Sequence, residues 1–121
     1  MAISFDQALG TYESALKLRA KRAEVLASNL ANVDTPNFKA RDFDFHQALK
    51  TEMSRGRGDT VAQSVDNNLR FRTPTQPSID GNTVDEHIEH AQYMENSLEF
   101  QTAFTLLNKR FSGMLSAIKG D

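Results

Sequence analysis

Residues 5–33 read FDQALGTYESALKLRAKRAEVLASNLANV and decide the fold of this chain. Positions along this stretch recur at alternating spacings of four and three, the heptad pattern of a helix that turns one side to a partner. Arg19 is the charged member of the series. The other members, which we call the N-terminal seam, are Phe5, Leu9, Tyr12, Leu16, Ala23, Leu26, Leu30 and Val33. The pattern predicts a helix over about residues 5–33, on the order of 40 Å long.

Both ends of this helix carry boundary signals. Ser4 and Gln7 have the spacing of a capping box, in which two side chains satisfy free N–H groups at a helix start. Pro36 ends the helix, because proline excludes the α conformation from the residue before it.

The C-terminal third predicts a second long helix. Thr83 and Glu86 form another candidate capping box, and Gly120 is a candidate stop. An apolar face opens with Val84, Ile88, Ala91, Met94 and Leu98. It continues in a stricter four-and-three series, the C-terminal seam: Phe100, Phe104, Leu107, Phe111, Met114 and Ile118.

The middle of the chain reads differently. Asp44 is placed to cap a short helix that carries Phe45, Ala48, Leu49 and Met53. From Arg55 to Gly81 the frequent Gly, Pro, Asn, Thr and Ser predict a loop, with a strand around residues 69–72. The chain thus divides into residues 1–36, 37–82 and 83–121.

These patterns predict a mainly α fold, in which the two long heptad helices pack as a coiled-coil-like hairpin around a loop-rich middle. Whether the two seams only cover each other or also join separate molecules is left open by periodicity. The second helix also has Leu98, Ala103 and Leu106 outside its seam. A single partner helix cannot cover all of these faces, which favours additional partners.

Composition excludes several classes of protein. The chain has no cysteine, so disulfides and thiolate metal sites are absent. Its net charge is −2 and no segment is basic enough to bind nucleic acid through phosphates. The first residues lack the apolar core of a cleavable signal peptide, and no apolar run is long enough to span a membrane. By these rules alone the chain is expected in the cytoplasm.

No residue pattern predicts catalysis. His87 and His90 are three apart, but without a third ligand they are expected to be solvated helix surface. His46 is expected to pack beside Phe45. Asp80-Gly81-Asn82 lacks the spacing of a calcium loop and reads as a turn. Arg55-Gly56-Arg57-Gly58 is too short for an RNA-binding repeat. We therefore expect no catalytic, metal-binding or cofactor-binding residue, no cofactor, no nucleic acid and no small-molecule substrate.

Residues 27–38, Ala-Ser-Asn-Leu-Ala-Asn-Val-Asp-Thr-Pro-Asn-Phe, carry a distinctive pattern. The segment resembles the N-terminal signature of bacterial flagellar rod and hook proteins, which it matches at Asn29, Leu30, Asn32, Thr35, Pro36 and Phe38. We call Asn29, Asn32, Thr35, Pro36 and Phe38 the signature joint. The two asparagine amides can also bond backbone groups where the helix ends. An ordinary helix end with no role in assembly would therefore have the same residue pattern.

Two later stretches, Asp80-Gly81-Asn82-Thr83-Val84-Asp85 and Asn96-Ser97-Leu98-Glu99-Phe100-Gln101, resemble the proximal-rod members of that family. The resemblance covers residues 5–54 and 76–120. It implies a structural subunit that is exported by the flagellar type III apparatus without a cleaved signal peptide. The expected location is then the periplasmic rod of the basal body, and no longer the cytoplasm.

The resemblance also implies the partners. They are copies of the chain itself, other flagellar rod proteins, the basal ring with its adaptor, and the export apparatus. Helical polymerisation through both seams and the signature joint would then transmit torque for motility. The alternative from another class is a soluble helical adaptor or secretion chaperone with a permanently closed hairpin.

Overall fold

The computed structural model describes residues 5–55, 61–74 and 76–120, with the side chains of residues 5–8 and 55 outside the description. Its elements are α1 (Phe5–Ala31), β1 (Arg41–Asp42), α2 (Phe45–Arg55), α3 (Val61–Asn68), β2 (Arg70–Phe71) and α4 (Glu86–Lys119). The mainly helical fold with two long terminal helices is confirmed. The capping role expected of Ser4 lies outside the described residues.

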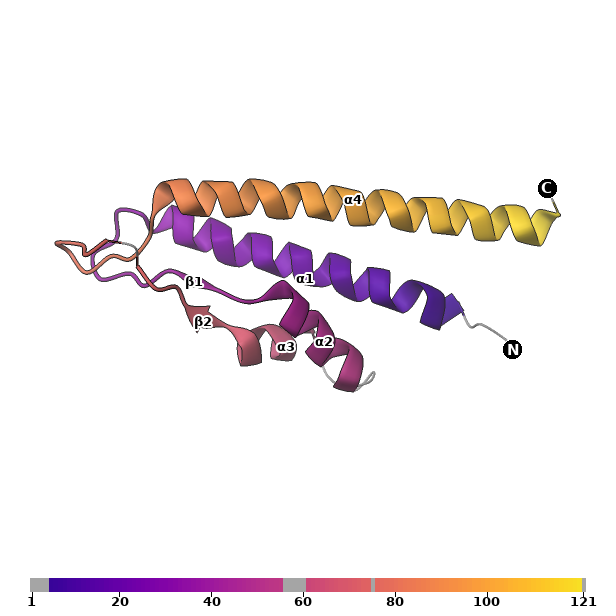
Figure 1. Ribbon diagram of the computed structural model, residues 1–121, viewed down its shortest axis with the longest axis horizontal. Coiled ribbons are helices and arrows are strands. Elements are labelled where there is room, and N and C mark those ends of the chain that lie inside the picture. The colour runs from indigo at the N-terminus through magenta and orange to yellow at the C-terminus, as the bar shows by residue number, and fades with distance from the viewer. Residues whose placement is uncertain (1–4, 56–60, 75, 121) are drawn as a thin grey trace.

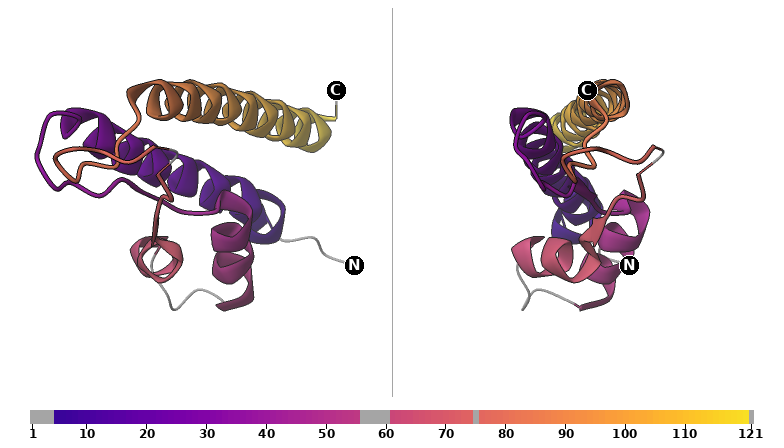
Figure 2. Two further views of the ribbon diagram at one scale, coloured as in Figure 1. Left: turned by 60° about the vertical axis from the view of Figure 1, so that its left-hand side comes forward. Right: turned by 90° about the vertical axis from the view of Figure 1, so that its left-hand side faces the viewer.

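The two long helices run antiparallel along the length of the molecule (Figure 1). Helix α1 lies in the middle, with α4 on one side and α2 and α3 on the other (Figure 2). The loops gather at one end of the hairpin, which we call the closed end. The N-terminus of α1 and the C-terminus of α4 lie at the other, which we call the open end (Figure 1).

The hydrophobic core lies between α1 and the middle segment, not between the two long helices. Its buried members are Leu18, Phe43, Phe45, Ala48 and Val65, with Ala15, Val25, Leu49, Val61 and Leu69 packed around them. Leu18 and Val25 are seven apart and outside the N-terminal seam, so α1 has a second apolar face. Along the chain regions that the structure describes, no helix is long and apolar enough to cross a membrane.

The middle segment is more ordered than its composition predicts. Asp44 caps α2 as expected, because its Oδ1 accepts from Gln47 N at 3.1 Å. The expected strand is β2, which pairs antiparallel with β1 (Arg41 opposite Phe71). However, α3 occupies part of the predicted loop, and it places Val65 in the core with Val61 packed against it. The His46 ring packs edge-on to Phe45, 5.5 Å between centroids, as predicted.

The capping box predicted for the start of α4 is wrong. Asp85, and not Thr83, is the cap, and its carboxylate accepts from His87 N at 3.1 Å and Ile88 N at 3.4 Å. The Thr83 hydroxyl instead accepts from Ala40 N at 2.8 Å, which ties the loop to the chain before β1. The predicted stop is confirmed, because Gly120 ends α4 with a φ of 77°.

We predict that Leu18→Ala lowers the free energy of unfolding by about 3 kcal/mol, because Leu18 is fully buried in the core. Urea denaturation of the purified chain measures this change. The matched control is Leu98→Ala on α4, where the side chain is mostly exposed and the change should stay below about 0.5 kcal/mol. Equal losses in the two variants would contradict a core on this side of α1.

Candidate functional site

The signature joint is built into the closed end through the amide of Asn29. This side chain is 1% exposed. Its Nδ2 donates to Arg41 O at 2.7 Å and to Glu89 Oε2 at 2.9 Å, and its Oδ1 accepts from Arg41 N at 3.1 Å. One amide therefore connects α1 to β1 and to α4. The expectation that Asn29 bonds backbone is correct, but the backbone belongs to a strand twelve residues away.

The other joint residues close the helix locally. Asn32 Nδ2 donates to Ser28 O at 2.7 Å, and Thr35 Oγ1 donates to Asn32 Oδ1 at 3.1 Å. Pro36 is exposed and Phe38 is half-buried, with Phe38 N donating to Thr35 O at 3.3 Å. The joint is therefore an ordered helix end within the subunit, and a contact between subunits stays a prediction.

Asn82 is a structural position that sequence reasoning missed. Its Nδ2 lies 2.9 Å from Asn32 O, 3.0 Å from Val33 O and 2.7 Å from Thr35 O, three acceptors at the end of α1. It stands after Gly81, where φ is 78° and an added Cβ would lie 2.4 Å from Asn37 Oδ1. A side chain would be strained there, which favours glycine, and the turn directs Asn82 at the carbonyls.

Two layers of buried polar contacts join α1 to α4. In the first, Arg19 Nη1 donates to Asn96 Oδ1 at 3.4 Å and Asn96 Nδ2 donates to Arg19 O at 2.9 Å. Arg19 also forms an ion pair with Glu99, and its guanidinium lies 3.5 Å above the Phe45 ring. Burial lowers the pKa of Arg19, an effect that the Glu99 carboxylate opposes. Arg19 thus explains the charged break in the seam, because it reaches both α4 and the core.

The second layer joins α1, α4 and the strands. Arg22 pairs with Asp42 at 3.0 and 3.1 Å and donates to Gln92 Oε1 at 2.8 Å. Burial alone would lower the pKa of Arg22, but hydrogen bonding to Asp42 and its charge outweigh burial and raise it. Arg72 pairs with Asp42 at 3.0 Å and with the fully buried Glu89 at 2.9 Å.

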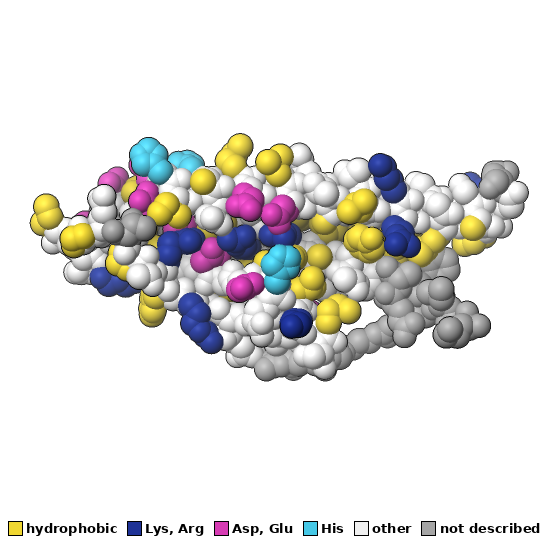
Figure 3. Space-filling model, viewed as in Figure 1, with side chains coloured by type: hydrophobic (Ala, Val, Ile, Leu, Met, Phe, Trp, Pro, Cys, Tyr) yellow, Lys and Arg dark blue, Asp and Glu magenta, His cyan; other side chains and the backbone are white. Residues whose placement is uncertain are grey.

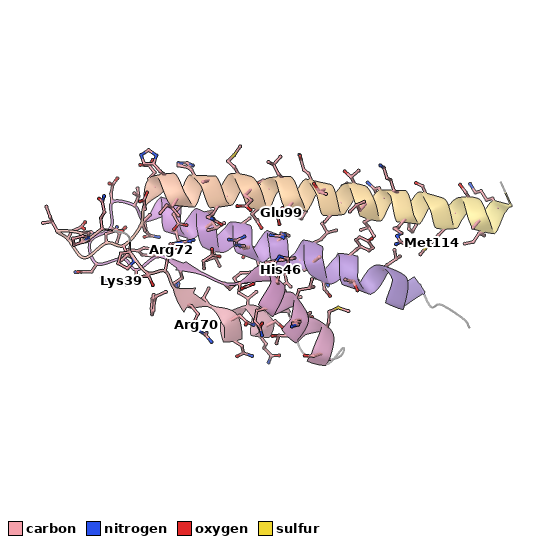
Figure 4. All side chains as sticks on the ribbon, in the orientation of Figure 1. Lys39, His46, Arg70, Arg72, Glu99 and Met114 are labelled. Atoms are coloured by element: carbon pink, nitrogen blue, oxygen red, sulfur yellow. The ribbon has the colours of Figure 1, made fainter. Side chains whose placement is uncertain are left out.

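These charges line a cleft of about 770 Å³ on the face seen in Figure 3, where blue and magenta side chains alternate in a central band. Arg72, His46 and Glu99 mark this band in Figure 4. The buried charges are paired, which suits a structural role more than acid–base chemistry. Within the described ranges, no group of three or more His, Cys, Asp or Glu is placed to hold a metal ion. His87 and His90 are exposed, with His90 Nε2 3.7 Å from Glu86.

The structure places the two seams unequally. Leu26 of the N-terminal seam is fully buried, Phe5 lies outside the described side chains, and Leu9, Tyr12, Leu16, Ala23, Leu30 and Val33 are half-buried. In the C-terminal seam, Phe100, Leu107 and Met114 are half-buried. The other three side chains are exposed, Phe104 to 49%, Phe111 to 48% and Ile118 to 67%. The hairpin therefore leaves part of the C-terminal seam uncovered.

Comparison with known proteins identifies the family. The family model described as "Flagella basal body rod protein" matches residues 9–39. The chain is 46% identical to the flagellar basal body rod protein FlgB of Aeromonas hydrophila, over 100% of this chain and 99% of the relative. It is 43% identical to FlgB of Salmonella typhimurium (95% of each chain) and 41% identical to FlgB of Escherichia coli (98% of each). The chain belongs to the FlgB family of flagellar basal body rod proteins.

Membership in the FlgB family makes the chain a structural subunit of the flagellar basal-body rod. The matched residues 9–39 contain the whole signature joint and most of the N-terminal seam. The expected resemblance to rod proteins is thus confirmed. The similarity to these relatives extends over nearly the whole chain, so the compared region contains residues 80–85, where Asn82 lies.

We predict that Asn82→Ala lowers the free energy of unfolding by about 1–2 kcal/mol, because three carbonyls at the end of α1 lose their donor. Hydrogen exchange should quicken at the N–H groups of Asn32, Val33 and Thr35, which depend on this helix end. Asn108→Ala, at an exposed position of α4, is the control and should leave both measurements unchanged.

Proposed function

We propose that this rod subunit is exported by the flagellar type III apparatus without a cleaved signal peptide and polymerises helically in the periplasm. In this proposal its partners are other copies, other rod proteins, the basal ring and its adaptor. The polymer transmits torque and catalyses no reaction. Residues 1–36 and 83–121 form the rod core, and residues 37–82 brace it from one side.

The observation that carries the proposal is the uncovered flank of α4 at the open end. Phe104, Phe111, Leu115 and Ile118 are all exposed and follow one another at spacings of seven, four and three. Such spacings keep side chains on one flank of a helix. A contiguous apolar flank on a soluble chain favours a protein partner, because burying it removes apolar area from water.

The low hydrophobic content of the chain supports the same conclusion. Only 39% of its residues are hydrophobic, and exposed positions take a large share of the bulky ones. The small core therefore gives the isolated subunit little stability from apolar burial. Beyond the polar layers, α4 packs against α1 and no other described element. Assembly would supply the missing burial.

We predict that Phe104→Asp prevents incorporation into the rod and abolishes swimming. A carboxylate would be buried without a partner at each subunit contact, at a penalty of several kcal/mol. The isolated variant should fold and be exported normally, because Phe104 is half exposed in the subunit. Leu107→Asp should also block assembly but would disturb folding too, since Leu107 is half-buried.

Motility plates, fractionation and analysis of isolated basal bodies measure these effects. Ser112→Asp, at an exposed serine on the same half of α4, is the matched control and should swim. Normal swimming of the Phe104→Asp strain would show that this flank faces solvent in the assembled rod.

For the signature joint, we predict that Phe38→Ala gives a subunit that is exported but not incorporated. Phe38 is half-buried beside an exposed Pro36, so part of its ring is available to fill a pocket on an adjacent chain. Basal bodies should stop before the rod, and Asp34→Asn, at an exposed position of the same turn, should assemble normally. Complete rods recovered by overproducing Phe38→Ala would instead indicate a purely internal role.

A further inference from the structure

A groove opens between the long helices at the open end. Its lining includes Tyr12 of α1 and Leu106, Lys109, Arg110, Gly113 and Met114 of α4, and its volume is about 490 Å³. The floor is largely apolar, whereas the rim carries the two basic side chains. Lys109 and Arg110 are exposed and form no ion pair with any described residue. The groove therefore fits an apolar group that has an acidic neighbour.

Gly113 keeps this groove open. A Cβ at this position would meet no atom within 4 Å, so the subunit itself has room for a side chain. Glycine in a helix interior is about 1 kcal/mol less favourable than alanine. The fold gives no internal reason for this cost, and close approach of another chain would provide one.

The opposite end of the molecule presents a matching projection. Ile79 is fully exposed in the loop before α4, and Asp80 beside it is exposed as well. This loop forms the extreme tip of the closed end (Figure 1), far from Met114 in the groove (Figure 4). Its base is held firmly, because Asn37 N donates to Asp80 O at 2.9 Å and Asn82 N to Asp80 Oδ1 at 3.1 Å. A fixed apolar projection loses little conformational entropy on binding.

Charge is divided along α4 and the turn before it in the same sense. From residue 80 to residue 99 the sequence has no Lys or Arg, and from residue 100 to residue 119 it has no Asp or Glu. The helix dipole favours such a division only in the first and last turns of α4. Glu95, Lys109 and Arg110 lie well inside the helix, so the dipole does not account for them. On the face shown in Figure 3, the magenta side chains stay on the half toward the loops.

We propose that the tip of one copy, residues 77–80, docks in the groove of the next copy of this chain. Ile79 enters the apolar floor beside Gly113, and Asp80 pairs with Lys109 or Arg110. This inference rests on the proposed polymerisation and names one of its contacts. The contact joins unlike surfaces at opposite ends of the subunit, so it propagates head to tail into a filament and does not close into a dimer.

The absence of native cysteine allows a direct test by disulfide trapping. A chain with both Ser78→Cys and Ala117→Cys is expressed in place of the wild-type chain, and isolated basal bodies are oxidised and run without reducing agent. Ala117 also lines the groove and is exposed, so this cysteine leaves Gly113 in place for the approach of the next chain. Head-to-tail docking predicts dimers and higher multimers for the double variant and only monomers for each single variant. Monomers alone from basal bodies that contain the double variant would overturn the inference.

Two further variants separate docking from folding. Ile79→Ser should leave the unfolding transition unchanged, since Ile79 is fully exposed, but should reduce incorporation roughly tenfold. Asp80→Lys should also reduce incorporation, and it removes the turn bond from Asn82 N to Asp80 Oδ1, so the isolated chain should lose some stability as well. Adding Lys109→Glu with Arg110→Glu in the same chain should restore incorporation but not that stability, because the charges at the contact are then reversed in sign. Failure of that rescue, or attachment of the trapped cysteine to a different protein, counts against docking between copies. If the wild-type chain itself were absent from rods, the proposed function would fail instead.

Discussion

The buried amide of Asn29 is the interaction on which the closed end depends. An asparagine amide offers two N–H groups and a carbonyl oxygen, and here Arg41 O, Glu89 and Arg41 N use all three. Because Arg41 belongs to β1 and Glu89 to α4, the amide fixes α1, β1 and α4 relative to one another. Leaving a buried polar group unbonded costs free energy, so each of these segments helps to hold the others in place.

The polar layers and the apolar end give the two halves of the hairpin different kinds of contact. Arg19 with Asn96, and Arg22 with Asp42, are contacts that set position more than stability, because desolvating charges offsets much of their attraction. Toward the open end the contacts are apolar and incompletely covered, as Phe104 and Phe111 show. The register of the helices is thus specified at the closed end, whereas apolar side chains of α4 stay exposed toward the open end.

Periodicity predicts the long helices well because each seam repeats locally, and Leu26 is buried as its seam position requires. The same reasoning missed Leu18, whose partners on α2 and α3 come from a segment too short and polar to predict. Asn82 could not be found in this way either, since its acceptors lie 47 to 50 residues earlier in the chain. The cap of α4 was predicted wrongly at Thr83, because the Thr83 hydroxyl accepts from the distant Ala40 N and Asp85 caps the helix instead. Sequence patterns report contacts made within a few turns, whereas the joint depends on contacts across the fold.

The two proposed contacts between subunits differ in kind, and a tubular rod would require both. The uncovered flank of α4 runs along the molecule, so a partner that covers it must lie beside the subunit. The groove near Gly113 and the tip at Ile79 lie at opposite ends, so docking between them places copies one after another. A head-to-tail contact alone gives a single flexible strand, and a side contact alone leaves its axial position free to slide. Together they fix both the rise and the rotation between neighbours, and a rod needs both to be stiff in torsion.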